Sequence, residues 1–159
     1  DVLVGMLPSF LGYALSFIYV GIYWNNHHHL LQATGHVSGG VLWSNLNLLF
    51  WLSLFPFSTA WMGNNHFEPL PTAVYGFVLF MAAVAYTILH RSIMATDGCS
   101  SVLRQAIGSD WKGKLSVVLY LAAIGLSFVL HWAAQAIYVG VALMWLVPDR
   151  RIERAMNES

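Results

Sequence analysis

Residues 115–147 read LSVVLYLAAIGLSFVLHWAAQAIYVGVALMWLV, and this stretch decides the fold because it is apolar almost throughout. A helix needs roughly 20 apolar residues to cross a hydrocarbon core about 30 Å thick, so the stretch is too long for one ordinary span. Its only polar interruption lies between His131 and Gln135. We therefore expect a tight helical hairpin there, with spans at about 115–130 and 133–147. One long tilted helix is the alternative.

Three more apolar stretches have the length of a membrane span, at about 7–24, 41–62 and 70–89. No linker or internal repeat divides the chain. Only helices and closed barrels satisfy their own backbone hydrogen bonds in lipid, and these stretches are long enough to be helices. We therefore predict an all-α fold, a polytopic membrane helix bundle in which residues 1–159 form a single transmembrane domain with five transmembrane helices.

Pro56 lies inside the second of these stretches and is expected to kink the helix. Proline has no backbone N–H to donate, so one carbonyl in the preceding turn loses its partner. The hydroxyl of Ser53 or Thr59 is expected to help satisfy the freed group.

The composition agrees with a protein that has lipid as its solvent. Apolar residues make up 58% of the chain and charged residues only 9%, against about 25% charged residues in soluble domains. The 7 Lys and Arg balance the 7 Asp and Glu, so no net field favours nucleic acid as a partner. The single cysteine, Cys99, excludes an intrachain disulfide.

Charge position predicts the orientation in the membrane. Every Lys and Arg falls within 91–114 or 150–154, and the positive-inside rule places both regions in the cytoplasm. We expect a multi-pass protein of the inner (plasma) membrane with its C-terminus cytoplasmic. Five spans then leave Asp1 outside, and we expect a further helix upstream of Asp1.

A cluster of polar residues is predicted at one depth, near the inner ends of the first two spans. Three consecutive histidines, 27–29, point about 100° apart on a helix and cannot all ligate one metal. A metal site, an interfacial anchor and an interhelical hydrogen-bond network are the three interpretations. We favour the network, because polar side chains at membrane depth face the protein interior. The predicted supporting polar network consists of Asn26, His27, His28, His29, Ser44, Asn45 and Asn47.

Motifs of other function classes are absent from the sequence. It contains no phosphate-binding loop, nucleophile elbow, paired carboxylates within a span or Thr-Val-Gly-Tyr-Gly filter. We therefore predict no catalytic residue, metal or cofactor, and no enzyme activity. A histidine-dependent membrane metalloenzyme is the alternative, but the orientation puts His66 and His131 outside and His90 inside, so they cannot meet at one site. A non-conducting structural or truncated protein is a third possibility.

Three segments resemble the bacterial relatives of transmembrane protein 175. LSFIYVGIYWNNHHHLL at 15–31 and VLWSNLNLLFWLSLFPFSTAWMG at 41–63 are similar to the second and third helices of that family. WLVPDRRIER at 145–154 is similar to the end of its sixth helix. The resemblance covers essentially the whole chain.

The resemblance implies a subunit of a potassium-permeable cation channel, with potassium ions and the lipid bilayer as partners and a homotetramer as the assembly. In that family the first helix lines the pore with a Phe-Ser-Asp signature and a hydrophobic constriction. This sequence has no such segment, so the resemblance implies that the pore-lining helix is absent and that no pore-lining or filter residue lies in this chain. It also implies that a histidine of 27–29 and Asn45 brace the first helix.

Overall fold

The computed structural model describes residues 2–32, 34, 37–95 and 111–146. This part of the chain consists of helices joined by short turns, and the prediction of an all-α fold is confirmed for it. The helices are α1 (Val2–Gln32), α2 (Gly39–Ser53), α3 (Phe55–Asn64), α4 (Pro69–Met94), α6 (Trp111–Ser127) and α7 (His131–Leu146).

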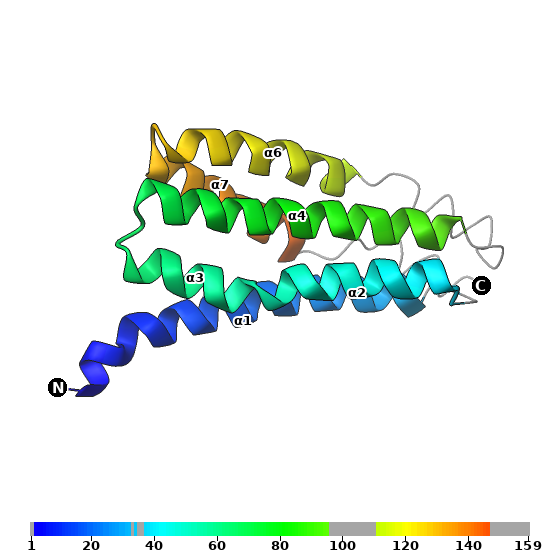
Figure 1. Cartoon of the computed structure of the whole chain (residues 1–159), viewed down its shortest axis with the longest axis horizontal. Coiled ribbons are helices and arrows are strands. Elements are labelled where there is room, and N and C mark those ends of the chain that lie inside the picture. The colour runs from blue at the N-terminus through cyan, green and yellow to red at the C-terminus, as the bar shows by residue number, and fades with distance from the viewer. Residues whose placement is uncertain (1, 33, 35–36, 96–110, 147–159) are drawn as a thin grey trace.

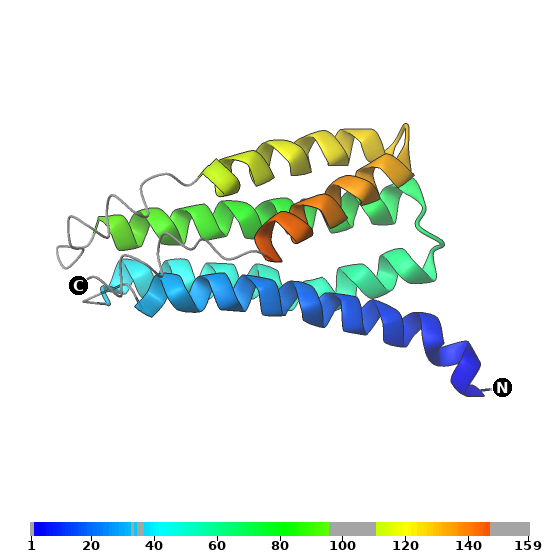
Figure 2. The ribbon, with the colours of Figure 1, turned by 180° about the vertical axis from the view of Figure 1, so that it is seen from behind.

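The helices form two layers. In Figure 1, α6, α4 and the α2–α3 pair lie side by side in front, and α7 and α1 lie behind them. Figure 2 shows the second layer from its own side, with α1 and α7 running in the same direction. We call the end of the bundle where α1 and α4 finish and α2 and α6 begin the inner end. The opposite end, with the α3–α4 and α6–α7 turns, is the outer end.

Among the described residues, two helical stretches are long and apolar enough to cross a membrane. They are Gly39–Asn64 and Pro69–Met94, each of 26 residues, and they match the second and third predicted spans. His131–Leu146 is apolar but shorter. The count of five transmembrane helices stays a prediction.

The helix is interrupted between α2 and α3, in the turn before Pro56. The N–H of Leu54 donates to the carbonyl of Trp51 at 3.2 Å, so it does not continue the regular i to i−4 ladder toward Phe50. The Ser53 hydroxyl donates to the Phe50 carbonyl at 2.7 Å and supplies that acceptor with a donor. The expected helix break is therefore present, but Ser53 donates to the Phe50 carbonyl and not to the Leu52 carbonyl, which is the one that the missing N–H of Pro56 leaves free.

The last apolar stretch folds as a hairpin, and the alternative of one long helix is wrong. The turn lies at 128–130, before the predicted site at His131, because the amides of Val129 and Leu130 close α6 on the Leu126 carbonyl at 3.0 and 2.7 Å. The turn residues are apolar, and Val129 is 83% exposed. An apolar turn carries no polar signal, so sequence reasoning placed the turn at the nearest polar residues.

A close contact between α4 and α7 lies where Tyr138 meets Gly76. The Tyr138 hydroxyl donates to the carbonyl of Thr72 at 3.2 Å, and its ring packs edge-on against Tyr75 with centroids 5.5 Å apart. A Cβ atom on Gly76 would overlap the Tyr138 hydroxyl. The absent side chain of Gly76 is therefore what lets α7 approach α4.

Gly76→Ala is expected to destabilise the protein by about 1–3 kcal/mol, because the new methyl group displaces a buried phenol. Equilibrium unfolding in detergent measures this loss. The control is Gly125→Ala on α6, where an added Cβ meets nothing within 4 Å. That change is expected to stabilise by about 0.5–1 kcal/mol, since alanine costs less backbone entropy in a helix. Equal effects of the two substitutions would contradict the assigned contact.

Candidate functional site

The candidate site lies near the inner end, where α1 meets α2. His27 on α1 is 8% exposed, and its Nε2 lies 2.5 Å from Oδ1 of Asn45 on α2. An amide oxygen only accepts, so this pairing requires a proton on Nε2. The pair joins two helices through one direct polar contact in apolar surroundings.

Asn26 precedes His27 but points to a different helix. Its Nδ2 donates to the carbonyl of Ile22 at 2.8 Å and to the carbonyl of Trp145 on α7 at 3.3 Å. Neighbouring helix residues diverge by about 100°, so these two side chains serve two interfaces. Asn26 joins α1 to α7, and His27 joins α1 to α2.

Ser44 makes a third, separate contact. Its hydroxyl donates to the carbonyl of Gly40 at 2.7 Å and lies 2.8 Å from the hydroxyl of Ser92 on α4. Ser44 therefore joins α2 to α4, about 100° around α2 from Asn45.

The remaining predicted network residues join none of these contacts. His28 is exposed and stacks on Trp24, with ring centroids 5.1 Å apart and planes 14° from parallel. His29 is half-buried, and its Nδ1 has no hydrogen-bond partner. Asn47 is exposed. The structure thus brings together His27 and Asn45 and separates the other members, and a shared role for all of them stays a prediction.

An apolar groove of about 310 Å³ runs between α1 and the α2–α3 kink. The groove is lined by Val20, Trp24, His27, Leu49, Leu52, Ser53 and Pro56. Its walls are almost wholly apolar, and His27 and Ser53 are the polar residues among them. A groove of this chemistry fits an apolar segment that presents one polar group to the histidine.

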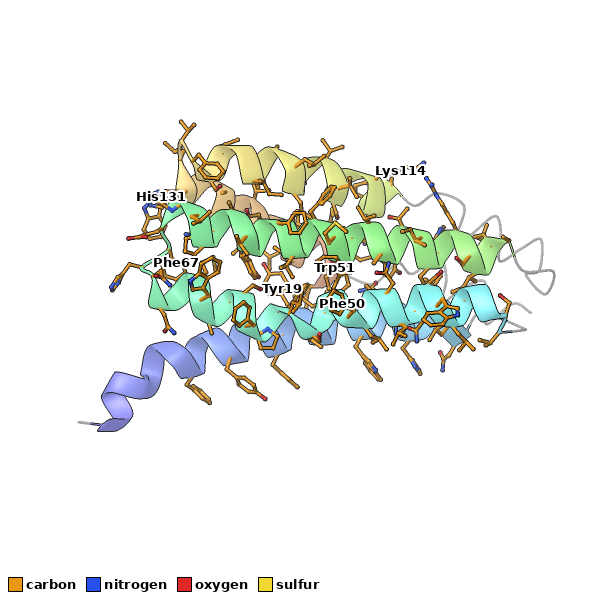
Figure 3. The ribbon with its side chains drawn as sticks, viewed as in Figure 1. Tyr19, Phe50, Trp51, Phe67, Lys114 and His131 are labelled. Atoms are coloured by element: carbon orange, nitrogen blue, oxygen red, sulfur yellow. The ribbon has the colours of Figure 1, made fainter. Side chains whose placement is uncertain are left out.

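A cluster of buried tyrosines was missed by sequence reasoning. Tyr19 on α1 is 4% exposed and donates its hydroxyl to the carbonyl of Tyr138 at 3.0 Å (Figure 3). The rings of Tyr19 and Tyr75 also pack edge-on, 6.3 Å apart. Thr59, the alternative to Ser53 at the Pro56 break, is buried and its hydroxyl has no hydrogen-bond partner, so it does not serve the break. The available signal was Tyr19 and Tyr23, one turn apart within an apolar span.

The other histidines are spread over both ends of the bundle. His131 lies at the outer end with Phe67 (Figure 3). His90 lies near the inner end of α4. Within residues 2–95 and 111–146, where described, no three His, Cys, Asp or Glu side chains gather in a way that would hold a metal ion. The basic residues at 150–154 and Arg104 lie outside the described residues.

Comparison with known proteins adds a family match over the first third of the chain. Residues 1–56 match the family model described as endosomal/lysosomal potassium channel TMEM175. All residues that line the groove fall inside this range, as does Asn45.

Three curated relatives are named as potassium channels. A protein from Chryseobacterium sp. (strain P1-3) is 51% identical over 154 residues, which cover 97% of this chain and 80% of the relative. A protein from Streptomyces collinus is 29% identical over 93 residues, covering 56% of this chain and 45% of the relative. A protein from Chamaesiphon minutus is 23% identical over 147 residues, covering 89% and 72%. No solved structure matches.

A double-mutant cycle of His27→Leu and Asn45→Leu tests the central pair. We expect a coupling energy of about 0.6 kcal/mol and at most about 1.7 kcal/mol, the values of interhelical hydrogen bonds in membrane proteins. Unfolding in mixed micelles measures it. A parallel cycle of His28→Leu with Asn45→Leu is the control, because His28 is exposed, and it should give no coupling. Equal coupling in the two cycles would rule out a direct bond.

Proposed function

This chain belongs to the TMEM175 potassium-channel family, and we propose on that premise that it is a subunit of a potassium-permeable cation channel in a plasma membrane. The observation that carries the proposal furthest in this chain is the His27–Asn45 pair beside an apolar groove, because this groove lies wholly in the part that matches the family model.

Ions cross between subunits in this proposal, not through one of them. The centre of the helix bundle is filled by large side chains, among them Phe55, Tyr120 and Tyr138, each at most 2% exposed. A packed interior leaves no path for an ion with its hydration shell. A pore must then lie on an axis shared by several copies, which supports the homotetramer.

The pore-lining helix lies outside residues 1–159 in this proposal and carries the hydrophobic constriction. Such a helix needs a place to pack, and the groove between α1 and the α2–α3 kink offers one. Apolar side chains of the helix would fill the groove, and one polar side chain would meet His27, whose ring is held by Asn45. The supporting role of this pair is thus to fix a polar anchor beside the pore.

The charged residues support an inner end in the cytoplasm. Among the described residues, Arg91, Lys112 and Lys114 lie toward the inner end, and Glu68 lies at the outer end. The positive-inside rule assigns the basic end to the cytoplasm. The C-terminus follows α7, which runs toward the inner end, so we propose that it is cytoplasmic.

Potassium flux into liposomes tests the function. The full-length protein that contains residues 1–159 is expected to conduct potassium passively once it is reconstituted, and a fluorescent potassium or membrane-potential dye measures it. Residues 1–159 alone are expected not to conduct, because the proposed pore lining lies elsewhere. Absence of potassium permeability in the correctly folded full-length protein would overturn the proposal.

A pair of histidine variants tests the role of the site in the same assay. His27→Leu in the full-length protein is expected to lower the flux by about threefold or more, since it removes a contact worth about 0.6 kcal/mol. The matched control is His28→Leu, a neighbour that faces outward. If both variants conduct like the parent, the groove does not support the pore.

A further inference from the structure

Two side-chain hydrogen bonds connect α1 to the backbone of α7. The Tyr19 hydroxyl donates to the Tyr138 carbonyl at 3.0 Å, and Asn26 Nδ2 donates to the Trp145 carbonyl at 3.3 Å. Each bond joins residues 119 positions apart in the sequence. The two donors on α1 and the two acceptors on α7 are each one heptad apart, so both bonds belong to one register of the two helices. This is consistent with the parallel course of α1 and α7 in Figure 2.

The two acceptor residues on α7 are themselves held by the front layer. The Tyr138 hydroxyl donates to the Thr72 carbonyl on α4 at 3.2 Å. Trp145 Nε1 donates to the Ser116 hydroxyl on α6 at 2.8 Å, and its ring packs on Tyr86 of α4, with centroids 5.4 Å apart. The α6–α7 hairpin is thus held by α4 and by its own internal bond, apart from its contacts with α1.

The bonds from α1 are directional in a way that the apolar contacts are not. Hydrogen bonds weaken steeply when the angle or distance departs from its optimum, whereas apolar side chains tolerate sliding. Tyr19 is 4% exposed and Asn26 is 8% exposed. A rotation of α1 away from α7 would leave the Tyr19 hydroxyl without the Tyr138 carbonyl and Asn26 with only the Ile22 carbonyl of its own helix. The two bonds therefore hold α1 in one rotation against α7.

We propose that Tyr19 and Asn26 are positioning residues, through which the α6–α7 hairpin sets the rotation of α1 and so aims His27 at Asn45. His27 follows Asn26 directly, so the direction of Asn26 determines that of His27 about 100° away. The inference rests on the proposed function only where it concerns channel activity. The α6–α7 hairpin lies outside the residues matched by the family model. The proposal gives this hairpin a role at the groove.

The test reads the His27–Asn45 contact itself. Histidine labelled with ¹⁵N in the full chain, held in lipid nanodiscs, gives an Nε2 signal for His27 that the His27→Gln variant assigns. Asn45→Leu supplies the reference position for an unpaired ring. In the double variant Tyr19→Phe, Asn26→Leu we expect the His27 signal to move from the parent position toward that reference. The ratio of paired to unpaired rings is expected to fall about eightfold, and about threefold in each single variant.

The control is Tyr13→Phe, because Tyr13 lies on α1 but is 62% exposed. It is expected to leave the His27 signal in place. A melting curve followed by circular dichroism accompanies each variant. If the double variant does not fold, the single variants Tyr19→Phe, which keeps the ring, and Asn26→Leu carry the test. A folded double variant, or a folded single variant at Tyr19 or Asn26, whose His27 signal stays at the parent position overturns the inference.

The outcomes separate this inference from the proposed function. A shifted His27 signal in a protein whose full-length parent conducts no potassium would overturn the channel proposal and support the positioning role. Normal potassium flux in the parent with an unmoved His27 signal in the folded double variant would support the channel proposal and overturn the positioning role. Both proposals are supported if the signal shifts and the flux of the same variant falls.

Discussion

The structure depends on the contact between Tyr138 and the bare backbone at Gly76. This contact lets α7 approach α4, and the phenol hydroxyl then reaches the Thr72 carbonyl at 3.2 Å. The backbone of the same tyrosine accepts the Tyr19 hydroxyl, so one residue joins α7 to α4 and to α1. In lipid, where apolar burial distinguishes poorly between helix faces, such close packing and buried hydrogen bonds decide which helices associate.

The candidate site depends on these contacts of Tyr138. α1 lies between the hairpin and the α2–α3 kink, bonded to α7 through Asn26 and to α2 through His27. The helix break before Pro56 bends the α2–α3 side of the groove, and Leu52, Ser53 and Pro56 line the groove there. A proline and a histidine from different helices thus line one groove, because the helices that carry them are fixed by contacts made elsewhere.

The sequence determined the all-α character, the helical hairpin and the break near Pro56. Each of these follows from local rules: apolar length, the lack of an N–H in proline and the internal backbone bonding that lipid demands. The sequence also placed His27 and Asn45 at the same depth, since depth is counted in residues from a span end. The position of the turn at 128–130 was missed, because that turn is apolar and gives no local signal.

Only the tertiary structure decided which polar neighbours meet. Asn26, His27 and His28 are consecutive, yet one faces α7, one faces α2 and one lies exposed against Trp24. The 100° step of a helix makes them diverge, but it does not say which helix each one meets; that depends on the rotation of α1. The rotation is set by Tyr19 and Asn26 reaching carbonyls 119 residues away, and main-chain acceptors are present at every position, so no residue type in the sequence marks them.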